Sequence, residues 1–410
     1  MYSPKYLICV TQNNNNKYYK MIPNGSSGWI AEYGRVNSTT TRVSYPYSDW
    51  DKKYREKLRK GYVDQSSLVE DLIKVNTCTS TNNKYSEDDA INDIVNRLQN
   101  MAKKVIAEHY TISSGKVTHA MIEEAQKIIT SLMTAEDVHE FNELLMKLFM
   151  TIPRKMQNVK DYIAKSKNDF DSIIHKEQDL LDVMGGQVYT AGQVYTAGED
   201  TNNSTDANFK VPTDNYLKNL GLTFEVCSSD DVDTIKKLLG NCAPKFKNAW
   251  KVTNIKTREK FDEFVKEHNI YTTKLLFHGS RNENWWSIIN SGLVLRPTNA
   301  VITGKMFGYG LYYATKAQKS LGYTSLSGSY WTKGNASSGF MALMEVACGK
   351  PYDVYNFDSK YYQYNWDKLK KVDPEASCIF AHAGTMLRND EIVVYKEEQS
   401  TIKYLIELSN

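Results

Sequence analysis

One segment constrains the fold more than any other: the apolar run from Lys274 to Phe277 and the turn His278-Gly279-Ser280 that ends it. A short apolar run of this kind is typical of a buried strand that delivers side chains to a site at its end. A helix is predicted over residues 283–290, because its apolar residues fall on one side and Gly292 is placed for a left-handed cap. Strand, glycine turn and helix together favour a nucleotide site.

A second segment, residues 303–323, combines glycines with aromatic residues. Gly304, Gly308 and Gly310 let the backbone approach a ligand closely, and the run after them places Tyr312 on a predicted strand. Nicotinamide in NAD is a flat cationic ring with a carboxamide, so a site for it wants aromatic faces and a partner for the amide. Groups of both kinds are available from Tyr312, Tyr323, Gly279 and Ser320.

A third segment, residues 387–395, places Glu391 immediately before an apolar run that is a predicted strand. A carboxylate at a strand end can be held rigidly beside a sugar. Taken singly, a His-Gly-Ser turn is a common sequence, a Tyr usually packs in a core, and a Glu at a strand end is usually a solvated charge. Their occurrence together and in order favours a functional site.

These three segments resemble the catalytic domain of the poly(ADP-ribose) polymerase family, which are diphtheria-toxin-like ADP-ribosyltransferases with a His-Tyr-Glu triad. The triad falls on His278, Tyr312 and Glu391, and all three positions hold the expected residue. The resemblance implies an active enzyme that uses NAD as its substrate and no metal. The flanks also match, over residues 275–281, 306–314, 345–347 and 401–408, with Lys319, Ser320 and Tyr323 among them.

The resemblance gives four residues a role in binding NAD. His278 holds the ribose of the adenosine half, and Ser280 assists there. The backbone of Gly279 pairs with the nicotinamide carboxamide, while the hydroxyl of Ser320 takes the other end of that amide.

The resemblance also implies how the reacting centre is arranged. Tyr312 and Tyr323 clamp the nicotinamide ring between them. Glu391 binds the ribose 2-hydroxyl, stabilises the developing cation and polarises an incoming hydroxyl nucleophile. Lys319 is either a cation that orients the acceptor or a phosphate, or a solvated surface lysine.

The N-terminal residues differ in charge from those that follow. Residues 1–65 contain eleven Lys and Arg against five Asp and Glu, a net charge of +6, whereas residues 66–186 carry −5. A basic end is the place to expect nucleic acid. The sequence from Gly28 to Val36 and the basic run from Trp50 to Lys60 resemble the WGR module of the DNA-dependent members of the family.

One residue of this module departs from the family pattern, because Tyr33 stands in place of the name-giving Trp. The resemblance implies that Tyr33 keeps a stacking surface near a DNA end and that Arg35 pairs with a phosphate. The alternative is a small β-domain with Tyr33 and Trp29 in its core and a solvated helix face at Lys52 to Lys60.

A helical region is predicted over residues 86–185. Ser86 with Asp89 gives a cap signal, and a second cap at Thr134 with Asp137 opens a helix that ends near Pro153. This region resembles the regulatory domain that covers the NAD site in DNA-dependent family members, which implies that binding of a DNA end loosens it. The alternative is a rigid helical spacer.

Residues 186–211 are predicted to be a linker. They contain the hexapeptide Gly-Gln-Val-Tyr-Thr-Ala twice, from Gly186 and from Gly192, followed by a polar run. A repeat this short marks a tolerated insertion in a flexible surface segment.

Composition excludes several classes of protein. No window approaches eighteen uninterrupted apolar residues, and the first residues lack the pattern of a secretory signal, so neither a membrane span nor export is expected. The six cysteines are scattered without metal-ligand spacing, which indicates reduced thiols of an intracellular protein. The resemblance places such a protein in the nucleus of a eukaryote or the cytoplasm of a bacterium.

The sequence therefore predicts a multidomain α+β protein. Its parts are a small β-rich WGR-like domain (residues 1–75), an all-α regulatory domain (86–185), the linker, and a mixed α/β transferase built on antiparallel sheets (212–410). We expect a monomer that binds DNA ends or breaks and transfers ADP-ribose to protein acceptors, itself included, with elongation to poly(ADP-ribose). Two alternatives stay open: a mono-ADP-ribosyltransferase of the same fold, and a catalytically idle scaffold that binds DNA ends.

Overall fold

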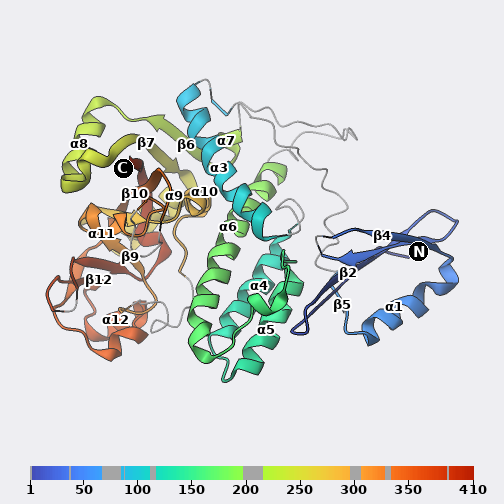
Figure 1. Ribbon diagram of the computed structural model, residues 1–410. Coiled ribbons are helices and arrows are strands. Elements are labelled where there is room, and N and C mark those ends of the chain that lie inside the picture. Colours follow the sequence, from blue (N-terminus) through green and yellow to red (C-terminus); the bar gives the residue numbers. More distant parts are fainter. Residues whose placement is uncertain are drawn as a thin grey trace. The chain divides into compact units, whose positions relative to one another are not determined.

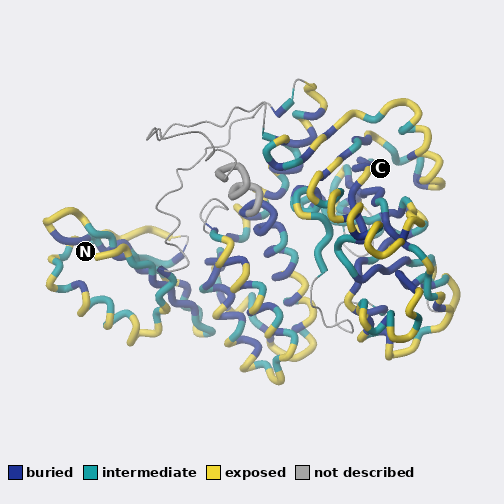
Figure 2. The backbone as a smooth tube through the Cα atoms, turned by 180° about the vertical axis from the view of Figure 1, so that it is seen from behind, coloured by how far each residue is buried: buried dark blue, intermediate teal, exposed yellow. Residues whose placement is uncertain are grey.

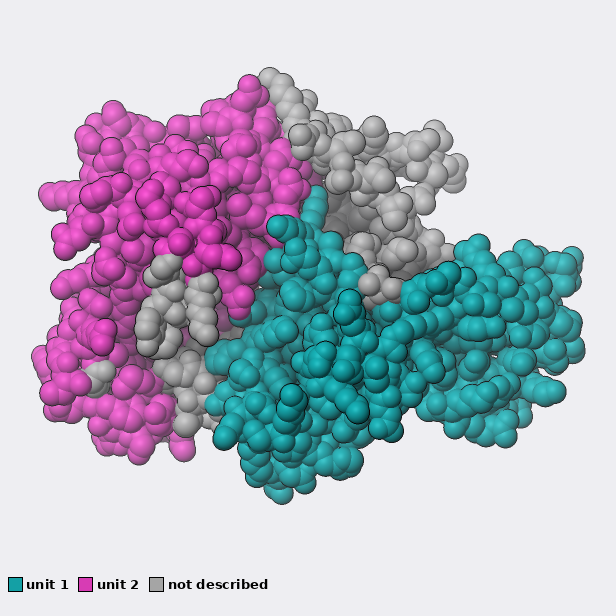
Figure 3. All heavy atoms as spheres, viewed as in Figure 1, with its two compact units in different colours: residues 1–79, 103–189 teal, residues 80–102, 190–410 magenta. Residues whose placement is uncertain are grey.

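The computed structural model describes residues 2–36, 38–66, 85–86, 88–110, 117–196, 216–295, 306–327, 334–385 and 387–410. The chain gathers into two compact units (Figure 3). Unit 1 contains residues 1–79 and 103–189, and unit 2 contains residues 80–102 and 190–410. Part of the predicted linker, residues 197–211, lies outside the described residues.

Unit 1 starts with a five-stranded antiparallel sheet in the order β4-β3-β2-β1-β5. Helix α1 (Trp50–Arg59) lies along this sheet (Figure 1), and its Trp50 packs with Trp29 and Met21 in a buried cluster. Residues 5–64 therefore form a small sheet with an α-helix, and Trp29 is a core residue. The strands are β1 (Lys5–Thr11), β2 (Asn15–Pro23), β3 (Trp29–Arg35), β4 (Thr41–Tyr45) and β5 (Val63–Asp64).

The other described part of unit 1 contains the α-helices α4 (His119–Leu132), α5 (Val138–Thr151) and most of α6 (Phe170–Thr196). The predicted cap at Thr134 was wrong by one turn. The carboxylate of Asp137 accepts a hydrogen bond from the Glu140 amide at 2.8 Å and so opens α5. Thr134 instead follows the end of α4, where its hydroxyl donates to the carbonyl of Ser131 at 3.0 Å.

The first part of the predicted linker is also different in the structure. Helix α6 does not stop before Gly186 but continues through the repeat to Thr196, and residues 186–188 are buried. A helix that has already formed adds residues without a new nucleation cost, so the glycines and valines of the repeat can join its end. The linker prediction was therefore wrong over residues 186–196.

Unit 2 is built on a nine-stranded sheet in the order β11-β12-β13-β9-β8-β10-β14-β7-β6. Its neighbouring strands pair antiparallel except β11 and β12, as the predicted antiparallel transferase requires. The first five strands are β6 (Leu222–Val226), β7 (Phe246–Asn254), β8 (Thr273–Gly279), β9 (Leu311–Ala314) and β10 (Ser338–Ala347). The others are β11 (Lys350–Val354), β12 (Ala376–Ala381), β13 (Glu391–Val394) and β14 (Ser400–Ser409).

Strands β10 and β14 are buried along nearly their whole length, and their neighbours in unit 2 are more exposed at the rim (Figure 2). Helix α10 follows β8 as predicted, and Gly292 ends it with a φ of 78°. The short helices around the sheet are α7 (Tyr216–Asn219), α8 (Ser229–Leu239), α9 (Ile255–Glu267), α10 (Trp285–Ser291), α11 (Ala317–Leu321) and α12 (Trp366–Val372).

Helix α3 (Asp89–His109) crosses the boundary between the two units. We expected residues 86–185 to form one helical domain, but residues up to Ala102 belong to unit 2. The reason is an apolar stripe, Ile91, Ile94 and Leu98 among its members, that packs in the same core cluster as transferase residues. Asp88 rather than Ser86 caps its first turn, since the Asp88 carboxylate accepts from the Ala90 amide at 2.8 Å.

Candidate active site

Three neighbouring strands bring the predicted triad together. Phe277 on β8 pairs with Ala314 on β9, and Ala314 pairs with Glu391 on β13. His278 directly follows Phe277, and its ring nitrogen Nδ1 lies 3.2 Å from the carbonyl oxygen of Tyr312. The alignment of these strand ends, which the sequence cannot specify, therefore places His278, Tyr312 and Glu391 in one region of the sheet.

The surroundings of His278 fix its ring. A carbonyl oxygen can only accept a hydrogen bond, so Nδ1 carries the hydrogen and Nε2 of the neutral ring is an acceptor. Trp285 packs at the edge of the ring with centroids 6.4 Å apart, and Tyr313 packs at 6.0 Å. The imidazole is thus held in one orientation and one tautomer.

The hydroxyl of Tyr312 is engaged by the glycine-rich segment that precedes it. The Phe307 amide donates to this hydroxyl at 3.0 Å, and the hydroxyl donates to the Gly308 carbonyl at 3.1 Å. Burial raises the pKa of Tyr312 far above its usual value, and the nearby charge of Glu391 raises it further. Tyr312 is therefore a neutral phenol whose ring, rather than its hydroxyl, is the group to meet a ligand.

Glu391 forms an ion pair with Lys319, which lies on α11. Both side chains are mostly buried, with 12% of Glu391 and 15% of Lys319 exposed. The alternative interpretation of Lys319 as a solvated surface lysine is therefore wrong. Charges in a desolvated site of this kind interact more strongly than charges in water, and the pair with Lys319 holds the carboxylate in place.

Gly279 and Ser320 lie in direct backbone contact. A Cβ atom on Gly279 would lie 2.0 Å from the carbonyl oxygen of Ser320, so only glycine lets β8 and α11 approach this closely. Ser320 is buried, and Tyr323 follows it with 37% of its surface exposed. Burial raises the pKa of Tyr323 to about 12, with a further contribution from the charge of Glu391. The residues predicted to hold a carboxamide and a ring therefore gather around Glu391.

The sequence reasoning missed Asn284, which precedes α10. Its Nδ2 donates to the hydroxyl of Ser280 at 3.0 Å. Its Oδ1 is buried without a hydrogen-bond partner among the described residues. A buried amide oxygen without a partner costs free energy unless a ligand group donates to it. The sequence held one signal for this contact: Asn284 follows Ser280 by four residues, near the start of the predicted helix.

The two predicted DNA contacts lie in unit 1 and differ in their surroundings. The Tyr33 ring stacks on Tyr19 with centroids 5.5 Å apart, and the ammonium of Lys57 lies 5.6 Å from the Tyr33 ring. Arg35 instead donates to protein oxygens, to Asn14 at 2.8 Å and 2.9 Å and to the Gln157 carbonyl at 2.7 Å. Arg35 thus connects the sheet to the segment between α5 and α6, a contact that the sequence did not indicate.

Comparisons with known proteins agree with this geometry. A family model described as the poly(ADP-ribose) polymerase catalytic domain matches residues 229–410, which contain the whole candidate site. The protein "Putative poly [ADP-ribose] polymerase-like 100L" of Invertebrate iridescent virus 6 is 32% identical over 182 residues, which cover 43% of this chain and 91% of that protein. The chain belongs to the poly(ADP-ribose) polymerase family. It is an ADP-ribosyltransferase that uses NAD as its substrate.

Two further relatives show how the similarity is distributed. "Uncharacterized protein 101L" of the same virus is 37% identical over 185 residues, or 44% of this chain and 76% of that protein. "Poly [ADP-ribose] polymerase 1" of Gallus gallus is 23% identical over 392 residues, or 87% of this chain and 37% of that protein. The chain thus spans about a third of the length of this larger polymerase, and the similarity includes unit 1.

None of the helices that the structure describes is long and apolar enough to cross a membrane. In the same part of the chain, no group of three or more His, Cys, Asp or Glu side chains is arranged to hold a metal ion.

Proposed function

We propose that this protein transfers ADP-ribose from NAD to protein acceptors, extends the product to poly(ADP-ribose), and is stimulated by DNA ends. The observation that carries the transfer is the buried carboxylate of Glu391, paired with Lys319 beside Tyr312 and near the fixed ring of His278. NAD fits this arrangement. His278 and Ser280 receive the adenosine ribose, and Gly279, Ser320 and the two tyrosine rings receive nicotinamide.

The bond changes follow from the positions of these groups. The bond between the nicotinamide nitrogen and the ribose breaks, and nicotinamide leaves as a neutral molecule with the electron pair. The ribose carbon becomes cationic, and Glu391 stabilises it by charge. An acceptor hydroxyl then adds to that carbon, and its proton passes by way of the Glu391 carboxylate to water. Glu391 also supports elongation, because the next acceptor is itself a ribose hydroxyl.

Lys319 has a positioning role in this proposal. Replacement by Met should lower kcat about 100-fold while the KM for NAD changes little, because an unpaired Glu391 is free to turn away from the ribose. Lys319→Arg should recover part of the lost kcat, since it keeps the charge. A steady-state kinetic comparison of the three proteins is the measurement. An equal loss of kcat in the Arg and Met variants would contradict pairing as the cause.

Stimulation by DNA has support in unit 1. The N-terminal sheet is basic, and the lysines of α1 lie among its tyrosines, with Lys57 4.1 Å from the Tyr19 ring. Hydrogen bonds join that sheet to the irregular segment after α5, among them Arg35 to the Gln157 carbonyl and Asn16 Nδ2 to the Arg154 carbonyl at 3.1 Å. A DNA end on the sheet would therefore act on the segment that connects α5 and α6, two of the helices that we propose as the regulatory region.

Turnover of NAD by the full chain, with and without short blunt-ended DNA, tests both parts of the proposal. We expect release of nicotinamide that rises with DNA and products that grow into long chains. Nicotinamide release without a response to DNA would refute the DNA dependence alone. Products of a single ADP-ribose would support the mono-transferase alternative, and DNA binding with no turnover would support the scaffold.

Arg35→Ala gives a sharper test of the coupling within unit 1. The variant loses the hydrogen bonds to Asn14 and Gln157, so the stimulation by DNA should fall about tenfold or more while basal turnover stays unchanged. Arg42→Ala is the matched control, because Arg42 is a surface residue of the next strand that pairs with Glu32. A similar response of both variants to DNA would argue against a specific role for Arg35.

A further inference from the structure

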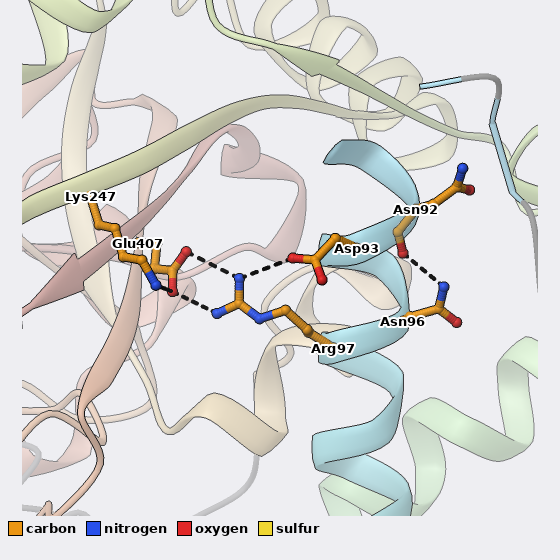
Figure 4. A network of polar contacts seen from close by, with 6 residues as sticks. All are labelled: Asn92, Asp93, Asn96, Arg97, Lys247 and Glu407. Carbon is orange, nitrogen blue, oxygen red and sulfur yellow. Dashed lines mark hydrogen bonds and ion pairs between the residues drawn. The ribbon is translucent and has the colours of Figure 1, made fainter. Parts of the chain in front are cut away.

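An ion cluster around one buried carboxylate joins the first half of α3 to the last strand of the transferase. The carboxylate of Glu407 on β14 is fully buried, and Arg97 of α3 donates to both of its oxygens, at 2.5 Å and 3.2 Å. Lys247 of β7 donates to the same carboxylate at 3.1 Å from the other side. Figure 4 shows Arg97 between Glu407 and the more exposed Asp93, which lies one turn earlier in α3.

The ionised state of Glu407 depends on this cluster. Burial pushes the pKa of Glu407 up, but the hydrogen bonds from Arg97 and Lys247 outweigh it and hold the pKa below its usual value. A buried carboxylate that loses its best partner keeps only Lys247, whose side chain is 48% exposed, and this state is less favourable than the intact cluster. Withdrawal of α3 from β14 is therefore strongly opposed.

Apolar contacts hold the same part of α3 in place. Ile94, Val95 and Leu98 have essentially no exposed surface and share a core cluster with Trp250 and Val252 of β7. These side chains line one face of the helix, at the spacing of one turn. The transferase therefore has no continuous core on this side without the helix.

Polar contacts fix the register of the helix at a second point. The Tyr85 hydroxyl donates to the Gln99 side chain at 3.2 Å, and that side chain donates to the Tyr216 hydroxyl of α7 at 3.3 Å. The Tyr85 and Tyr216 rings pack 4.9 Å apart. Two separated sets of contacts thus hold residues 85–102 on unit 2, while α3 continues beyond Ala102 into unit 1.

We propose that residues 85–102 are a fixed part of the transferase, held by the Arg97–Glu407 pair, and that regulatory movement of the helical region bends α3 after Ala102. The first part stands on the contacts alone, and the second rests on the proposed regulatory function. A consequence concerns truncation. Removal of all residues before 186 exposes the transferase core, whereas removal of residues 103–185 leaves it covered.

Native-state hydrogen exchange on the full chain tests the first part without an activity assay. The amides of Ile94, Val95 and Leu98 should open with the same free energy as those of β14, because they belong to one cooperative unit. The amides of α4 should open independently. Exchange of residues 94–98 together with α4, and apart from β14, would overturn the proposal.

Three variants of the full chain test the ion pair and the direction of its effect. Arg97→Met should lower the Tm of the transferase by about 5–10 °C, and the double variant Arg97→Met/Glu407→Met should regain most of it, because the buried carboxylate that lost its best partner is gone. Asp93→Asn, whose carboxylate is 3.4 Å from Arg97 at the surface, is the control and should keep the Tm. Basal turnover without DNA should not rise in any of them. A rise in basal turnover of Arg97→Met at an unchanged Tm would make the contact a releasable latch and overturn the proposal.

Discussion

Replacing Glu391 with Gln should reduce NAD turnover by roughly 100-fold to 10,000-fold and shorten the polymer further still. Gln keeps the size of the side chain and can still hydrogen-bond the ribose, so binding of NAD should change little. It has no charge to stabilise the cationic ribose and no basic oxygen to take the acceptor's proton. Because every round of elongation needs both functions, the average product should shrink to one or a few units.

The measurement combines nicotinamide release with product length on a gel, and the affinity for NAD is measured by calorimetry. Glu375→Gln is the matched control, because Glu375 also pairs with a lysine, Lys350 at 2.7 Å, but on an exposed surface. Surface pairs of this kind contribute little, so turnover and polymer length should match those of the unmodified protein. If the Glu391→Gln variant made full-length polymer, Glu391 would not be required for elongation.

Local signals in the sequence were sufficient for much of the transferase. The strand that ends at Gly279 and the helix that stops at Gly292 were predicted because apolar spacing and a left-handed glycine are properties of a few consecutive residues. The same holds for the strand that starts at Glu391. The resemblance to the polymerase family indicated which residues of these elements form the site. Hydrophobic periodicity alone does not contain that information.

Contacts between distant residues were outside the reach of such signals. Arg97 and Glu407 are 310 positions apart, and each looks like an ordinary surface charge on its own element. Lys319 was equally ambiguous until the sheet placed Glu391 beside it. The hexapeptide repeat was misinterpreted for another reason. Its glycines favour a loop when the repeat is considered alone, but the helix before it extends through the repeat.

Gly279→Ala should abolish binding of the nicotinamide half of NAD. The added Cβ would lie 2.0 Å from the carbonyl oxygen and 2.9 Å from the carbonyl carbon of Ser320, both backbone atoms that cannot swing aside. Strand β8 and helix α11 must therefore separate, and α11 carries Ser320 and Lys319 with it. A displacement of about 1 Å at a reacting centre costs about 100-fold in rate, so turnover should fall by at least that factor.

Binding of free nicotinamide, measured by calorimetry, separates this cause from general damage to the fold. Gly384→Ala is the control, because a Cβ at Gly384 meets no atom within 4 Å. Overpacking at Gly279 should also lower stability by about 1–3 kcal/mol, which Tm detects as a shift of several degrees, while the control stays unchanged. If Gly279→Ala kept its affinity for nicotinamide, the carboxamide would have to bind elsewhere than between β8 and α11. The backbone contact of Gly279 and Ser320 would then serve packing alone.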